Sequence, residues 1–246
     1  MKPEAIQETV LAPGSLPPGS TRLLPEEIPG ATPVLHVLKK GTELELAASE
    51  TTLRVLFLLK GSATFLAEDA NIAYTEPAVF AHRPQAKIRI TPQTDAAVLE
   101  IEWQLTGEEA GLLLESRKLP FTQTYAASQQ YRDPFKSEKT ISRAIVPHRV
   151  LPRFAMGSVE THGTDLVGQH AHPLLDQFFF SLPENDCILL IDSMQYPMKG
   201  NTLLHIPLGS NHGVFTGPQH CAHYLWVDFI PDESGLVYLD QVHKPV

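Results

Sequence analysis

The chain has 246 residues, enough for one large or two modest domains, and 43% of them are hydrophobic, which is ample for a buried core. The net charge of −9 argues against a nucleic-acid groove or an anionic membrane surface as partner. Two cysteines, Cys187 and Cys221, without a Cys-x-x-Cys pair, fit a reducing compartment rather than a disulfide scaffold. Since neither a signal peptide nor a run of roughly 20 apolar residues is present, we expect a cytoplasmic protein.

The first half of the chain indicates an all-β protein with frequent turns. Residues 1–30 are rich in Pro, Gly and Glu, and we expect an extended arm that packs on a barrel or on a second copy of the chain. Prolines are spread throughout, and short β-branched and aromatic runs lie between them. The runs that predict strands are 33–39, 53–59, 63–67, 78–82, 88–91 and 96–105.

The second half carries most of the histidines. Residues 107–119, which precede it, have acidic residues first and basic residues last, and this order favours a short helix or turn cluster. The polar composition of residues 121–140 predicts a linker. Residues 141–246 then hold nine of the eleven histidines, and this asymmetry locates the chemistry. The predicted strands of this half are 144–146, 153–157, 166–170, 177–182, 187–193, 203–206 and 224–230.

Three histidines and a glutamine form the most informative pattern. His170 and His172 stand at positions i and i+2, and on a strand this spacing points both rings to the same face. Gln177 follows five residues after His172, and His212 ends a Pro-x-Gly-x-x-His run a strand or two later. Two histidines on one strand and a third on a neighbour would converge nitrogen ligands on a transition metal.

This pattern resembles the two motifs of the cupin superfamily, whose members are small β-barrels. The first motif of that family combines His-x-His with a Glu, and the second ends in Pro-x-Gly-x-x-His. The resemblance implies that His170, His172 and His212 bind one divalent transition metal (Zn, Ni, Mn or Fe), with Gln177 at the position of the usual Glu ligand.

The sequence departs from the family pattern in several places. Gln177 replaces Glu, Gly163 and Gly200 each lie one residue too far from their motifs, and residues 183–186 replace the closing Gly of the first motif. Asp176 is a competing ligand, since some cupins place the acid one residue earlier. By alternation Asp176 and Gln177 cannot both face a barrel interior unless a bulge intervenes, and the usual register favours Gln177.

The first half repeats this strand pattern without the ligands. Ala-Ala-Ser-Glu at 47–50 stands where His-x-His would be, and the two histidines there, His36 and His82, are too scattered to build a site. We therefore expect an all-β fold of two tandem cupin (jelly-roll) barrels, a degenerate one at 31–120 and a metal-binding one at 141–246. The last hundred residues resemble the uronate and deoxyglucuronate ketol isomerases, which are bicupins with the metal in the C-terminal barrel.

The ligand set indicates the chemistry. Three neutral imidazoles and an amide would leave a divalent ion most of its charge as a Lewis acid, so we expect an isomerase or lyase for a small polar carbonyl or sugar-acid substrate. A non-haem Fe(II) dioxygenase and a non-catalytic metal- or ligand-binding protein stay open as alternatives. The candidate bases are His205, His223, Tyr224, Glu160 and Asp176. We also expect a homodimer, the commonest assembly of soluble chains.

Overall fold

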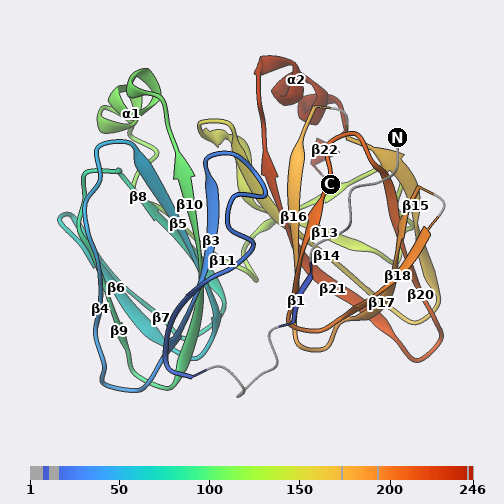
Figure 1. Ribbon diagram of the computed structural model, residues 1–246, viewed down its shortest axis with the longest axis horizontal. Coiled ribbons are helices and arrows are strands. Elements are labelled where there is room, and N and C mark those ends of the chain that lie inside the picture. The colour runs from blue at the N-terminus through green and yellow to red at the C-terminus, as the bar shows by residue number, and fades with distance from the viewer. Residues whose placement is uncertain (1–7, 11–16, 173, 193, 243, 246) are drawn as a thin grey trace. The chain divides into compact units, whose positions relative to one another are not determined.

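The computed structural model describes residues 8–10, 17–172, 174–192, 194–242 and 244–245 (Figure 1). Strands dominate this part of the chain, and two short helices, α1 (Gly107–Leu114) and α2 (Glu233–Val242), accompany them. The expected β-rich architecture is therefore present. Neither of these helices combines the length and the apolar character that crossing a membrane requires. The described backbone divides into two compact units, one within residues 16–127 and the other within 128–246 together with the strand at Glu8–Val10.

The unit within residues 16–127 contains two antiparallel sheets. One sheet has the strand order β11 (Phe121–Thr124), β8 (Ala78–His82), β5 (Thr52–Lys60), β10 (Ala96–Gln104), β3 (Ala31–Leu38), β2 (Gly19–Arg22). The other has the order β4 (Leu44–Leu46), β9 (Ile88–Pro92), β6 (Ala63–Ala67), β7 (Ala70–Tyr74), and its strands lie side by side in Figure 1. Side chains from both sheets, including Leu56, Phe65, Phe80 and Ile90, form one apolar core.

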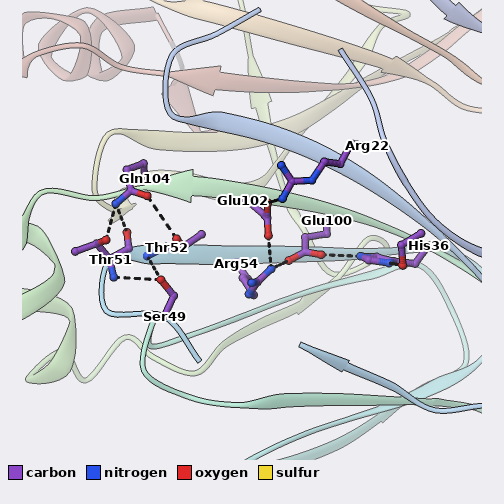
Figure 2. A network of polar contacts seen from close by, with 10 residues as sticks. Arg22, His36, Ser49, Thr51, Thr52, Arg54, Glu100, Glu102 and Gln104 are labelled. Carbon is purple, nitrogen blue, oxygen red and sulfur yellow. Dashed lines mark hydrogen bonds and ion pairs between the residues drawn. The ribbon is translucent and has the colours of Figure 1, made fainter. Parts of the chain in front are cut away.

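A buried ionic network replaces this apolar core along part of β10. Glu100 lies on the same face of β10 as the core residue Val98, because side chains alternate along a strand. Its carboxylate is 2.6 Å from His36 Nε2 and also contacts the guanidinium of Arg54, which bonds Glu102 at 2.6 Å (Figure 2). Burial would raise the pKa of Glu100, but the His36 hydrogen bond and the Arg54 charge outweigh it and hold that pKa below its usual value.

The unit that includes residues 128–246 is built on a single large sheet. Its main strand order is β1 (Glu8–Val10), β19 (Thr202–Ile206), β16 (Asp176–Ser181), β21 (Cys221–Phe229), β14 (Phe154–His162), β13 (Ile141–Leu151), β12 (Gln129–Arg132), β22 (Lys244–Pro245). Off this path, the paired strands are β15 (Asp165–Ala171), β17 (Asp186–Ile191), β18 (Met194–Lys199) and β20 (Asn211–Thr216). Pairing of β17 with both β20 and β21 makes the sheet curl around a core that contains Phe179, Leu189 and Trp226.

The structure refines several sequence expectations. Helix α1 covers the first part of 107–119 and begins at a capping box between Thr106 and Glu109, which satisfies backbone N–H groups at the helix start. The stretch 121–140 contains strands β11 and β12, and the division between the two units falls inside it. Helix α2 and strands β4, β7, β18 and β20 lie outside the predicted elements. Within the arm at 1–30, β1 pairs with β19 and β2 pairs with β3. A role of the arm in association stays a prediction.

The network around Glu100 makes a prediction about stability. Replacing Glu100 with Gln leaves the largely buried Arg54 guanidinium without this carboxylate and weakens the hydrogen bond to His36, and we expect the free energy of unfolding at pH 7 to fall by about 3 kcal/mol. The matched control is Glu102→Gln, whose carboxylate is more exposed and which should cost about 1 kcal/mol or less. Urea denaturation measures both losses. If both variants lost the same free energy of unfolding, the buried ion pair of Glu100 would not be the stabilising contact.

The pH dependence of this difference follows from the lowered pKa of Glu100. A carboxylate whose pKa is lower in the folded state than in the unfolded state stabilises the protein fully above the unfolded value, about 4.3 for Glu. That stabilisation is lost as the pH falls through the folded pKa. The gap between the wild type and Glu100→Gln should therefore be largest near neutrality and should narrow below about pH 4.

Candidate metal centre

The pairing of β15 with β20 brings the histidines together. His170 lies directly opposite His212, and Val167 lies opposite Val214, so three residue steps on β15 match two on β20. This β-bulge turns His170 to the same side as Val167, whereas strict alternation would place them on opposite sides. Gly213 permits the close approach of the bulge, since a Cβ there would lie 2.6 Å from the carbonyl oxygen of Val167.

The three imidazoles meet in a compact, largely buried cluster. The ligand nitrogens of His170, His172 and His212 all lie within 4.8 Å of one another. Nδ1 of His170 donates to the carbonyl oxygen of Gly168 at 2.8 Å, and Nδ1 of His212 donates to that of Ser210 at 3.1 Å. These bonds leave the Nε2 lone pairs of both rings for a ligand, as do backbone carbonyls that accept from the other ring nitrogen in histidine metal sites.

Burial keeps two of these rings uncharged. It lowers the pKa of His170, and it is the largest cause that lowers the pKa of His212 to about 4. A neutral imidazole offers a lone pair to a metal, whereas an imidazolium does not. The donor set therefore fits a transition metal such as zinc, nickel, manganese or iron rather than calcium or magnesium, which prefer oxygen ligands.

Gln177 lies in the cavity wall beside the three histidines. Its Nε2 donates to Oδ1 of Asp228 at 2.7 Å, which fixes the orientation of the carboxamide and leaves its oxygen as the remaining donor. Asp176, the alternative ligand, is absent from this wall, and its carboxylate is 3.6 Å from His205 Nε2. Alternation along β16 is thus regular, with Gln177 and Phe179 on the cavity side.

The candidate bases fall on different sides of the sheet. Tyr224 lines the cavity, and burial raises the pKa of its hydroxyl well above the usual value, so it can donate a hydrogen bond but is a poor base. His205, His223 and Glu160 are not among the cavity-lining residues. His205 packs against the ring of Phe178, His223 contacts Glu184, and Glu160 pairs with Arg143 at 2.8 Å.

The cavity is also lined by four polar residues that the sequence analysis did not select. Tyr131, Asp133 and Lys136 come from the stretch expected to be a linker, and Asp228 comes from the apolar strand β21. Burial raises the pKa of Asp228 to about 7. The one available signal was Asp228 itself, a lone carboxylate within an apolar run, because such a group needs a buried partner. Nothing in the pattern of 121–140 pointed inward.

The cavity is small and mostly apolar in its walls. The centre of a water-sized sphere can move through about 30 Å³, which is room for an ion and one or two waters. Apolar side chains complete the lining, and they are Val159, Val167, Phe179, Val214 and Trp226. A group bound here is therefore held in a setting of low polarity, where electrostatic interactions are stronger than in water.

Comparison with known proteins identifies the fold. No family model and no curated protein matches the chain. Among solved structures, it is similar to a cupin 2 conserved barrel domain protein from Leptotrichia buccalis, with a TM-score of 0.59, 14% identity and coverage of 86% of this chain and 88% of that one. The chain is also similar to an IolB-like protein from Salmonella typhimurium, with a TM-score of 0.68 and 17% identity. This similarity covers 91% of this chain and 94% of that one.

A third similar structure is the formate complex of Lactobacillus farciminis oxalate decarboxylase, with a TM-score of 0.65, 14% identity and coverage of 94% of this chain and 84% of that one. At these identities the similarities establish the cupin barrel fold and leave the activity open.

The cluster of histidines makes a prediction about metal content. Exchanging both His170 and His172 for Ala should abolish the binding of zinc, because two of three nitrogen donors are lost, while circular dichroism stays that of the wild type. The matched control replaces the exposed His162 and His220 with Ala and should keep the full zinc content. Elemental analysis after dialysis gives the stoichiometry. A full equivalent of metal in the first variant would contradict the site.

The contact between Gln177 and Asp228 makes a prediction about the fourth ligand. Gln177→Leu should weaken zinc binding by at least about tenfold. Gln177→Glu alone should bind poorly, because it places two carboxylates at the 2.7 Å contact with Asp228. Adding Asp228→Asn restores a donor and should give affinity at or above the wild-type value. Competition with a zinc indicator measures all three. Asp176→Asn is the control, and weaker binding in it would show that Asp176 is the ligand.

Proposed function

We propose that the chain is a metal-dependent enzyme of the isomerase or lyase class, acting on a small polar carbonyl compound such as a sugar acid. The observation that carries this proposal is the convergence of His170, His172, His212 and Gln177 on one small buried cavity. A divalent metal ion held by these uncharged side chains would supply Lewis-acid polarisation of a substrate oxygen.

The side chains around the cavity suit this chemistry. Asp228 orients the Gln177 carboxamide through the 2.7 Å hydrogen bond, so the donor oxygen is held before a ligand arrives. The protonated hydroxyl of Tyr224 can donate a hydrogen bond to a substrate oxygen. The apolar side chains, among them Phe179 and Trp226, exclude water from the reacting group.

The same proposal includes the arrangement of the chain. We take the two units to be tandem cupin barrels, of which the C-terminal one holds the metal. In the described part of the N-terminal unit no three His, Cys, Asp or Glu side chains form a cluster suited to a metal ion. Similarity to oxalate decarboxylase, solved with formate, supports a small carboxylic acid as the kind of compound to test. A homodimer stays part of the proposal.

The reaction class is tested by proton NMR in deuterium oxide. The zinc-, manganese- and iron-loaded proteins are incubated separately with D-glucuronate, 5-keto-4-deoxyuronate and oxaloacetate. We expect the signals of a ketol isomer or of a cleavage product from one of these acids, formed faster than with the free metal ion alone, and no such excess with the His170→Ala/His172→Ala variant. Oxygen uptake by the iron-loaded protein coupled to product formation would instead indicate a dioxygenase. Metal binding with no turnover of any acid would indicate a binding protein.

A further inference from the structure

Lys136 is a buried cation at the edge of the candidate metal centre. Its side chain is 9% exposed, and its ammonium lies 3.1 Å from Asp133 Oδ2 and 3.3 Å from the hydroxyl of Tyr131. An ammonium has three donors, and these two contacts leave one for a ligand. Burial of an ammonium costs several kcal/mol unless it is paired, and here the Asp133 carboxylate and the Tyr131 hydroxyl hold it charged at the wall of the histidine cavity.

The segment that carries Lys136 is fixed to the strand that carries His170. The backbone N–H of Gly168 donates to the carbonyl oxygen of Phe135 at 2.7 Å. The ring of Phe135 stacks on that of His170, with centroids 4.3 Å apart and planes 6° from parallel. These contacts hold the residue next to Lys136 directly on a candidate metal ligand, so the position of the ammonium is coupled to that of the imidazole.

A second anchor lies at the far end of the same segment. The carboxylate of Asp165 accepts hydrogen bonds from the hydroxyls of Ser137 and Thr140, each at 2.9 Å, and of Thr161 at 2.7 Å. Asp165 is the first residue of β15, which also carries His170. Both ends of the segment are therefore attached to β15. Because the segment is already ordered, the Lys136 ammonium can bind a ligand without an entropic cost of ordering the backbone.

A second cavity shares part of its wall with the histidine cavity. It is polar, offers about 170 Å³ to the centre of a water-sized sphere, and is lined by residues between Gln130 and Ser142. The side chains common to both cavities are Tyr131, Asp133 and Lys136. The histidine cavity, with about 30 Å³, holds only a reacting group, and the second cavity has room for the remainder of a larger molecule.

The charges favour an anion. The proposed ligands are uncharged, and the charged groups that line the histidine cavity are Lys136, Asp133 and Asp228. Even with both carboxylates ionised, a divalent ion and one ammonium leave a net charge of about +1 in a cavity of low polarity. A neutral ligand would leave this charge uncompensated, whereas one carboxylate would balance it.

We propose that Lys136 binds a carboxylate of the substrate, with Asp133 and Tyr131 positioning the ammonium, and that the second cavity holds the hydroxylated remainder. The substrate class is then a hydroxylated carboxylic acid, from the size of glycerate to that of a hexuronate. This assignment rests on the proposed metal-dependent function, and it adds a specificity-determining residue that the motifs do not contain.

Isothermal titration of the zinc-loaded protein tests the assignment with acids and their neutral counterparts. The pairs are D-glycerate with glycerol and D-glucuronate with D-glucose. We expect at least one acid to bind about tenfold to a hundredfold more tightly than its counterpart, as a charge-assisted hydrogen bond predicts. Lys136→Met should remove this preference without changing the zinc content. Lys139→Met, which alters an exposed ammonium three residues away, should retain it.

A second variant protects the test against misfolding. Lys136→Met leaves Asp133 without its cation, so Lys136→Met/Asp133→Asn removes both charges together and should give the same loss of preference with a wild-type melting temperature. If the wild type binds zinc and prefers an acid that the Lys136 variants also prefer, Lys136 has no such role and the proposed function stands. If neither acid binds better than its counterpart, the assignment is wrong. If the wild type binds no zinc, the proposed function itself fails.

Discussion

The register between β15 and β20 is the constraint on which the candidate centre depends. Val167 and Val214 face each other in the core, while the neighbouring pair, Leu166 and Phe215, is exposed at 52% and 41%. A slip of β15 by one residue would turn Val167 to solvent and bring the exposed face of that strand inward, and full burial of a valine contributes about 1.5 to 3 kcal/mol. The energy that fixes the register of the valines is therefore hydrophobic, and the register together with the bulge between Val167 and His170 places His170 opposite His212.

The bulge in β15 shows how much of the site the sequence could predict. The His-x-His and Pro-x-Gly-x-x-His runs select three histidines that the structure brings together, and the register of the family motif selects Gln177, which lines the same cavity. That these side chains bind a metal stays a prediction. Strict alternation applied from Val167 would have turned His170 outward. One extra residue on β15 reverses this, and its position depends on the close approach at Gly213, which one strand's sequence does not reveal.

Lys136 and Asp228 illustrate a different limit. Lys136 lies between strands, in a segment with neither helical nor strand periodicity, so only its contacts with Asp133, Tyr131 and the second cavity place it at the site. The fold class was easier to predict, because proline-punctuated runs of β-branched and aromatic residues have few other structures open to them. The candidate bases His205 and His223 are selected by residue type alone, and neither lines the cavity. Their role as bases stays a prediction.

The two units treat buried charge in opposite ways. In the N-terminal unit, His36 and Arg54 enclose Glu100, so each ionised group already has its partner within the chain (Figure 2). In the C-terminal unit, Nδ1 of His170 and Nδ1 of His212 each donate a hydrogen bond to a backbone carbonyl. The Nε2 atoms of both rings have no charged partner among the described residues. Because the charges of the network around Glu100 already neutralise one another, an added metal ion or anion would bind to it only weakly. An uncharged set of donor atoms beside a buried ammonium would be stabilised by both, and this difference in compensation is the reason for proposing the binding site in the C-terminal unit.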